Sequence, residues 1–310
     1  MKSIAALIAT LLLSIAAFAA ESWYPSRYGA DDTLGAVNNL SAAKVLEAVR
    51  LIKEGKTYSL GVPTGPDTPA WGSRSYGAII QRLDEGNGLP PGKNRVTGHD
   101  DFLHVWLGIG SQIDGLGHIG IDHVYYNGVP GSDFLTATAL TKFSTHELPP
   151  IVTRGVLLDM RKHLGQNPVA AGTAFNRAEI DAAAKAQGVS IGHGDVVLFY
   201  TGWLALADTD PARFIASEPG LGIDGARYLA GLGVVAVGSD TWALEAQPAE
   251  DPQLVFPVHQ ELLTKNGVYI LENMDTAALA ADAGYEFMFV LGQPKFVGTV
   301  QAVINPIAIR

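Results

Sequence analysis

The sequence predicts one domain of the mixed α/β class. Apolar runs of strand length recur along the chain, and the run 195–201 (DVVLFYT) is typical of a strand buried on both faces. Amphipathic helical segments lie between some of these runs, but there are more strands than a doubly wound parallel sheet would need. No internal repeat, low-complexity tract or linker divides the 310 residues. Since 47% of them are hydrophobic, the chain can bury one large core.

The N-terminal part after the leader begins with turn-rich sequence at 23–40. Ser41 is a suitable N-cap for a helix over 42–53, in which apolar residues recur on one face. A strand is predicted at 58–62. The segment 63–100 is rich in Pro, Gly, Asp and Asn, so we expect a long loop that covers a site.

The rest of the chain alternates between strands and helices. Asn176 begins a helix that reaches Gln187, with Glu179 at the capping-box position, and a short helix is predicted at 224–232. Apolar runs predict strands at 102–109, 151–160, 195–201, 234–237, 268–271, 285–291 and 297–304.

The first 19 residues read as a secretory signal peptide. One positive charge at Lys2 precedes an apolar run, and small residues at Ala17 and Ala19 suit cleavage after Ala19 or Ala20. The alternative is a membrane anchor, but the run is short for a bilayer, which needs about 20 apolar residues. We therefore expect a mature domain over 20–310 that is periplasmic or secreted.

Composition excludes several function classes. The chain has no cysteine, so thiol catalysis, thiolate metal ligands and disulfides are absent. Its formal charge of −10 becomes −11 when Lys2 is removed with the leader. An excess of negative charge argues against a nucleic-acid partner or an anionic membrane surface.

The stretch 108–118 (GIGSQIDGLGH) holds three side chains that could bind a metal. In an extended strand Gln112 and Asp114 share a face. Gly115 and Gly117 allow a bend that brings His118 back toward them. A carboxylate, an amide oxygen and an imidazole suit a divalent cation such as Zn²⁺ or Mn²⁺. The alternative is a glycine-rich turn whose polar side chains face solvent.

A second group of polar residues lies about 140 residues further along. His259 precedes a short amphipathic segment, and Glu272 ends the apolar run 268–271. An acidic residue at the end of a buried strand is a common position for a site residue, although a solvated strand end has the same pattern. Glycine patterns at 188–192 and 220–225 lack the strand-to-helix context that nucleophile elbows and dinucleotide sites require.

Several segments together resemble the cyclase family of metal-dependent hydrolases, of the kynurenine formamidase and isatin hydrolase type. The family hallmark is approximately H-x-G-T-H-x-D-x-P-x-H, and the stretch 108–118 is similar to it. The segments 28–40, 194–203, 219–222, 237–241, 259–263 and 267–273 add to the resemblance in the same order. The resemblance covers nearly the whole mature chain.

The resemblance implies a single compact β/β/α swivelling-type domain that assembles as homodimers or homotetramers. It implies hydrolysis of an amide, lactam or ester carbonyl by metal-activated water, with arylformamidase-like action on C–N bonds. Gln112, Asp114 and His118 would hold the metal. His259 and Glu272 would move protons or complete the ligand set. The substrate would be a small, aromatic molecule, for which Trp71, Trp106 and Trp203 could form an apolar pocket.

The chain departs from the hallmark at its first two histidines. Gly108 replaces the first and Gln112 the second. The loss of two imidazoles favours one divalent metal, Zn or Mn, over a two-metal centre. Two other functions stay open: an exported small-molecule binding protein on the same scaffold, and a metal-dependent lyase or dehydratase with His259 as base.

Overall fold

The computed structural model describes residues 22–82 and 88–310. The predicted signal peptide and both predicted cleavage positions lie outside the described residues. Within the described ranges, no helix is both long and apolar enough to cross a bilayer.

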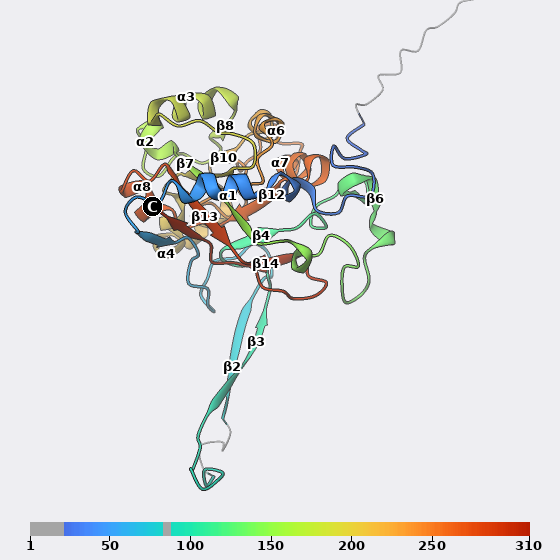
Figure 1. Cartoon of the computed structure of the whole chain (residues 1–310), viewed down its shortest axis with the longest axis vertical. Coiled ribbons are helices and arrows are strands. Elements are labelled where there is room, and N and C mark those ends of the chain that lie inside the picture. The colour runs from blue at the N-terminus through green and yellow to red at the C-terminus, as the bar shows by residue number, and fades with distance from the viewer. Residues whose placement is uncertain (1–21, 83–87) are drawn as a thin grey trace, which may run out of the picture.

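A nine-stranded mixed sheet forms the centre of the molecule (Figure 1), in the order β1–β15–β13–β7–β9–β11–β12–β4–β14. The strands β7, β9, β11 and β12 run parallel, and antiparallel strands flank them on both sides. This confirms the predicted mixed α/β class. The strands are β1 (Thr57–Ser59), β4 (Gln112–Asp114), β7 (Ile151–Asp159), β9 (Val196–Tyr200), β11 (Ala236–Ser239), β12 (Tyr269–Glu272), β13 (Glu286–Leu291), β14 (Gln301–Val303) and β15 (Ile307–Ile309).

The core lies on the parallel strands. In β9 the side chains from Val196 to Phe199 are all fully buried, as the continuous apolar run predicts. Neighbouring residues of β7 and β11, such as Leu157 and Val237, are equally buried. The carboxyl ends of β9, β11 and β12 therefore meet at one edge of a rigid sheet, where polar side chains can be held in fixed positions.

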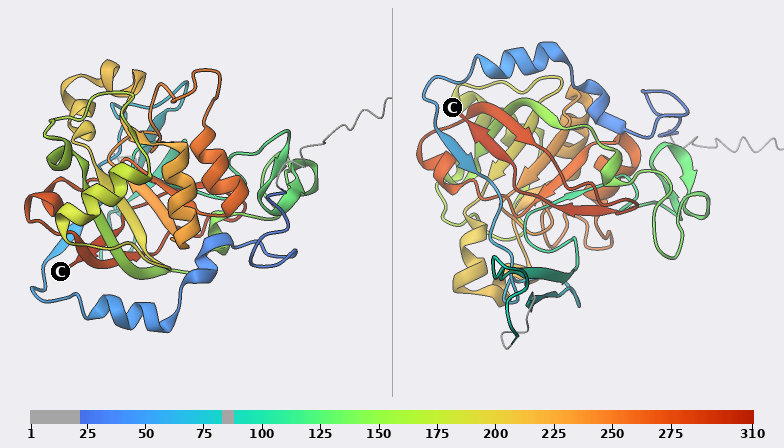
Figure 2. Two further views of the ribbon diagram at one scale, coloured as in Figure 1. Left: turned by 90° about the horizontal axis from the view of Figure 1, so that it is seen from above. Right: turned by 60° about the horizontal axis from the view of Figure 1, so that its bottom comes forward.

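Helices cover this sheet. The helix α1, blue in Figure 2, lies on the outside of the domain against β7 and β13. It ends at Val49 rather than at Lys53, so the predicted helix is too long by one turn. The capping box at Asn176 and Glu179 is confirmed. The helices are α1 (Ala42–Val49), α2 (Met160–Leu164), α3 (Arg177–Gln187), α4 (Leu206–Thr209), α5 (Pro211–Ala216), α6 (Ile223–Leu232), α7 (Pro257–His259) and α8 (Ala277–Ala281).

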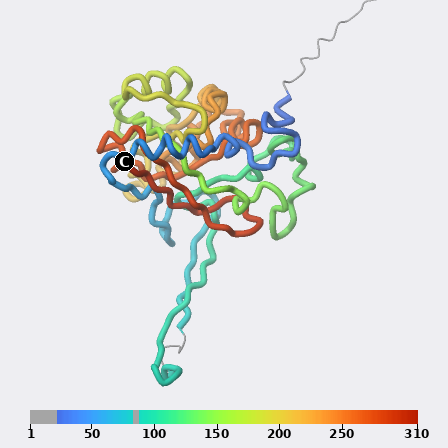
Figure 3. The backbone as a smooth tube through the Cα atoms, in the orientation of Figure 1, coloured from blue at the N-terminus to red at the C-terminus, as the bar shows by residue number. Residues whose placement is uncertain are grey.

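A two-stranded arm of β2 (Tyr76–Arg82) and β3 (His99–Val105) projects from the domain (Figures 1 and 3). It corrects two expectations: part of 63–100 is a strand rather than a loop, and the strand predicted at 102–109 stops at Val105. The chain turns before β4 because Gly110 has a φ of +67°, which breaks an extended strand.

Smaller differences occur elsewhere. Two short pairs, β5 (Val124–Tyr125) with β6 (Val129–Pro130) and β8 (Ala174–Phe175) with β10 (Gly220–Leu221), lie outside the main sheet. The strand predicted at 297–304 is only the three residues of β14, and β15 follows it as a separate strand between β1 and β13.

Candidate metal site

Adjacent antiparallel strands bring together the first candidate ligands. In β4, Gln112 and Asp114 share a face, as predicted. The register places Glu272 of β12 directly opposite Gln112. The Gln112 Nε2 donates to Glu272 Oε2 at 2.5 Å, and all three side chains are buried. The sheet therefore joins residues that are 160 positions apart in sequence.

The turn after β4 returns His118 to the same place, as predicted. The His118 backbone N–H donates to the Gly115 carbonyl at 3.0 Å, and His118 Nε2 lies 3.9 Å from Asp114 Oδ2. Gly115 and Gly117 are required because there is no room for a Cβ atom at either position. A Cβ at Gly115 would lie 2.6 Å from the Val300 carbonyl oxygen, and one at Gly117 would collide with a leucine.

His259 lies at the centre of the site, where α7 passes into a π-helical turn. Its Nε2 is 3.6 Å from Asp114 Oδ2 and 3.3 Å from Glu272 Oε1. Its Nδ1 is 2.5 Å from Glu245 Oε1, and Glu245 also accepts the backbone N–H groups of residues 258 and 259. A carboxylate on the outer nitrogen fixes the ring and directs Nε2 inward, as for many metal-binding histidines.

These residues fit a divalent cation. One donor atom from each of Asp114, His118 and His259 lies within 4.8 Å of the other two. Among the described residues, Asp114 Oδ2 and Gln112 Oε1 are buried and have no hydrogen-bond partner. Buried oxygens are rarely left unpaired, and a cation would satisfy both. One carboxylate with two imidazoles is a donor set that suits Zn²⁺ or Mn²⁺.

The charges in the site are strongly coupled. Burial opposes ionisation of Asp114, but His118 and His259 hold its pKa at about 2. Burial and then the Asp114 charge raise the pKa of Glu272 to about 7. Burial lowers the pKa of His118. Burial also opposes a charge on His259, yet the neighbouring carboxylates of Asp114, Glu245 and Glu272 raise its pKa well above the usual value. A cation would displace the proton that these carboxylates hold on His259.

A cavity of about 200 Å³ opens onto these groups. Trp242 supplies a buried indole N–H that has no partner among the described residues. Aromatic faces, a guanidinium and the catalytic candidates therefore surround one small space. The lining residues are Trp71, Arg74, His118, Ile119, Trp242, Ala243, Phe256, His259 and Glu272.

Of the three tryptophans suggested for this pocket, one lines the cavity and two do not. Trp71 lines the cavity and lies edge-on to Phe256, at 6.0 Å between ring centroids. It belongs to the segment 63–100, so part of that segment does cover a site. Trp203 is buried in the core and donates to the Phe214 carbonyl, and Trp106 is half-exposed; neither lines the cavity.

Other residues of the site were not found from the sequence. Glu245 orients His259, and Gln301 Nε2 donates to Asp114 Oδ1 at 2.6 Å. The strand register explains Gln301, because β14 places it opposite Asp114, but no sequence motif marks it. A Cβ at Gly108 would lie 2.8 Å from Gln301 Oε1 and 3.1 Å from Arg74 Cζ. The space next to Gly108 is therefore already filled.

Comparisons with known proteins agree with this fold. The family model Cyclase, described as "Putative cyclase", matches residues 58–246, more than half of the chain. A solved structure described as a novel cyclase is 28% identical, covers 91% of this chain and 96% of its own, and has a TM-score of 0.83.

More distant structures share the fold. Isatin hydrolase A from Ralstonia solanacearum is 17% identical over 82% of this chain and 92% of its own, with a TM-score of 0.62. An isatin hydrolase bound to the product analogue thioisatinate is 17% identical over 87% and 98%, with a TM-score of 0.59. The search of curated proteins gave no significant match.

Proposed function

The chain belongs to the cyclase family, and from this premise we propose that it is a metal-dependent hydrolase of small carbonyl compounds. One observation carries the proposal: Asp114, His118 and His259 present three donor atoms to one point, and the Asp114 oxygen that faces both histidines, Oδ2, is buried without a hydrogen-bond partner among the described residues. These three residues would hold the metal, with Gln112 Oε1 as a fourth donor. When bound, a divalent cation lowers the pKa of water from 15.7 to about 7 and so supplies hydroxide near neutral pH.

We propose a single metal. At the position of the hallmark's first histidine, Gly108 leaves room that Gln301 and Arg74 occupy. The Arg74 guanidinium is close enough to oppose protonation of His118 and to favour the charged form of Glu272. The protein therefore places a fixed positive charge next to the position of the hallmark's first histidine. This charge opposes the binding of a second cation there.

The chain's own groups have distinct roles in this proposal. Glu245 holds the His259 ring, and Gln301 holds Asp114. Glu272 lines the cavity next to His259, in position to accept a proton from the attacking water. Trp242 lines the same cavity, and we assign its indole N–H, which is unpaired among the described residues, as donor to the substrate carbonyl oxygen. Trp71 and Phe256 provide apolar contact for an aromatic substrate.

The proposed substrate class is an aryl formamide or lactam, with the C–N bond cleaved. The isatin hydrolases among the similar structures support a cyclic amide, and the aromatic side chains around the cavity support an aryl group. The test is turnover of formanilide, isatin and phenyl acetate by metal-loaded protein. We expect hydrolysis of formanilide or isatin, and none by Asp114→Asn protein.

The same panel separates the competing functions. Metal-loaded protein that binds these compounds without converting any of them would support a binding protein. Release of water from a hydroxylated substrate, without hydrolysis of the panel, would support a lyase or dehydratase. Turnover of phenyl acetate alone would move the specificity from C–N to ester bonds.

Gln112→His tests whether Gln112 is a metal ligand. Its Nε2 is engaged with Glu272, which leaves Oε1 for the cation. Because imidazole binds Zn²⁺ better than an amide oxygen, we expect the Kd for zinc to fall by about tenfold. Competition with a chromogenic chelator measures it. Lower turnover with an unchanged Kd would instead assign Gln112 to substrate contact.

Export remains part of the proposal, on the strength of the apolar leader with its small residues at Ala17 and Ala19. Expressed from its full sequence in a Gram-negative host, the protein should be found in the periplasmic fraction with Ala20 or Glu21 at its N-terminus. An intact Met1 on cytoplasmic protein would contradict this, and N-terminal sequencing decides it.

Self-assembly into dimers or tetramers is also proposed, and the arm supports it. Ile79, Ile80, Phe102 and Leu103 on β2 and β3 are all more than half exposed. An isolated two-stranded hairpin is marginal in water, so a second copy that covers these side chains would stabilise it. Light scattering on the periplasmic protein should give at least twice the chain mass; the mass of one chain would contradict the proposal.

A further inference from the structure

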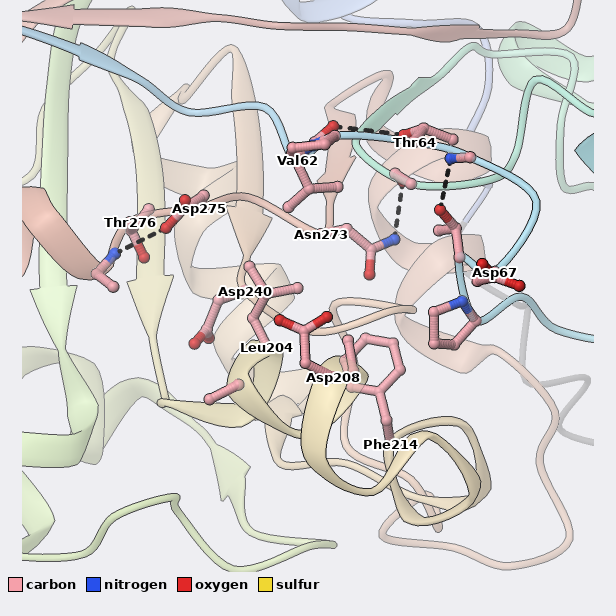
Figure 4. Close-up of a pocket in the computed structure, with 18 of the residues that line it drawn as sticks. Val62, Thr64, Asp67, Leu204, Asp208, Phe214, Asp240, Asn273, Asp275 and Thr276 are labelled. Carbon is pink, nitrogen blue, oxygen red and sulfur yellow. Dashed lines mark hydrogen bonds between the residues drawn. The ribbon is translucent and has the colours of Figure 1, made fainter. Parts of the chain in front are cut away.

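A second cavity, shown in Figure 4, has a volume of about 610 Å³. Like the metal site, it includes residues at the carboxyl end of β12. It shares no lining residue with the smaller cavity. A cluster of Trp203, Phe214, Trp242 and Ala243 lies between the two, since Phe214 lines the larger cavity and Trp242 the smaller. The floor of the larger cavity is formed where β9, β11 and β12 end, which is the usual location of ligand sites on parallel strands.

All the charged side chains that line this cavity are acidic. Asp67, Asp208, Asp240 and Asp275 come from four separate segments, and the lining contains no lysine, arginine or histidine. Three of these carboxylates are exposed at the rim, whereas Asp240 is 1% exposed. Two guanidinium groups lie behind this lining: that of Arg161 is 5.2 Å from the ring centroid of Tyr200, and that of Arg213 is 5.2 Å from the ring centroid of Trp203.

A buried hydroxyl in the floor has no partner. Thr276 is fully buried and lines the cavity, and its Oγ1 makes no hydrogen bond within the described residues. It occupies the N-cap position of α8, where a threonine normally accepts a backbone N–H, but here it does not cap the helix. Unpaired buried hydroxyls are rare, so this one is available to a ligand group.

Asp240 is the second polar group of the floor. Its Oδ1 accepts the N–H and the hydroxyl of Thr201, and its Oδ2 accepts the N–H of Gly202. These bonds fix the carboxylate but supply no positive charge. Burial accordingly raises the pKa of Asp240 to about 6 despite the hydrogen bonds. A cation in the cavity would stabilise the charged form.

The rest of the lining is apolar. Pro63, Pro66 and Pro69 cover one side, and Leu204 and Phe214 cover another. Figure 4 shows Leu204, Phe214 and the Asp208 carboxylate around the same space as Asp240 and Thr276. The cavity thus combines anionic and hydroxyl groups with hydrophobic walls.

We propose that this second cavity binds a protonated primary amine carried on a small apolar body. The ammonium group would donate to Asp240 and Thr276 in the floor, with Asp208 nearby, and the apolar body would pack against Leu204, Phe214 and the prolines. The site is separate from the proposed metal centre and does not depend on its chemistry.

The probe is 2-phenylethylamine, measured by isothermal titration calorimetry against the neutral 2-phenylethanol. We expect the amine to bind at least about tenfold more tightly than the alcohol, because only the amine can form a charge-assisted hydrogen bond. Binding should be the same after metal removal with a chelator. Equal affinity for amine and alcohol, or loss of amine binding with the metal, would overturn the proposal.

Three variants locate the site. Asp240→Asn should weaken amine binding by about tenfold or more, and Thr276→Val and Asp208→Asn by a few-fold each. Thr276→Val should fold even if Asp240→Asn does not, because the hydroxyl that it removes has no partner in the described chain. Asp122→Asn, an exposed aspartate outside the cavity, should bind as the wild type does. If folded Thr276→Val and Asp208→Asn proteins both bind as tightly as wild type, the proposal is wrong.

Discussion

Asp114→Asn is expected to abolish both metal retention and hydrolysis. Asp114 Oδ2 faces the Nε2 atoms of His118 and His259 at 3.9 and 3.6 Å, and no other group in the described structure satisfies it. Asparagine keeps the shape but removes the charge that offsets the cation, and a side-chain amide can direct N–H groups at the two histidines. We expect metal affinity to fall by about 100-fold or more.

Elemental analysis of dialysed protein measures this effect, with formanilide and isatin turnover in parallel. Asp122→Asn makes the same charge change on the surface and should retain metal. Asp114→Asn protein that holds stoichiometric metal would remove Asp114 from the ligand set.

Glu245→Gln should produce the second largest effect. Its carboxylate lies 2.5 Å from His259 Nδ1 and is 1% exposed, so it sets both the ring orientation and the basicity of Nε2. Glutamine would keep one oxygen for the backbone N–H groups but lose the negative charge. Loss of such a partner typically lowers metal affinity by about 10- to 100-fold.

Zinc affinity by chelator competition and kcat on the same substrate should fall together in Glu245→Gln. Glu147→Gln, an exposed glutamate outside both cavities, serves as the control and should change neither. A normal zinc Kd in Glu245→Gln would show that His259 is not a ligand and would leave it a role in proton transfer only.

The strands of the parallel core were predictable because they contain continuous runs of apolar residues, a pattern that indicates a strand buried on both faces. The run 195–201 and the observed β9 agree within one residue at each end. The arm was not predictable: the alternation in β2 and β3 is obscured by Pro, Gly and Asp around it, and its side chains are exposed rather than packed on a core. The strand predicted at 102–109 ends at Val105, and the chain turns before β4 at Gly110, whose positive φ a hydrophobic pattern does not reveal.

In the site, too, local features could be predicted from the sequence and tertiary ones could not. Gln112 and Asp114 share a face because they are two positions apart in a strand, which can be read from the sequence. Glu272 lies opposite Gln112 through strand register, which only the folded sheet determines. Glu245, Gln301 and Arg74 reach the site through tertiary packing, and their sequence neighbourhoods carry no motif. For this reason the sequence suggested the candidate ligands but not the residues that position them.

The most direct test of the proposed function is the metal content of wild-type protein purified without chelator, followed by hydrolysis before and after metal removal. We predict about one equivalent of zinc or manganese per chain, loss of formanilide or isatin hydrolysis when it is stripped, and recovery when it is restored. Protein that contains no divalent metal, cannot be loaded with one, and converts neither substrate would contradict the proposal.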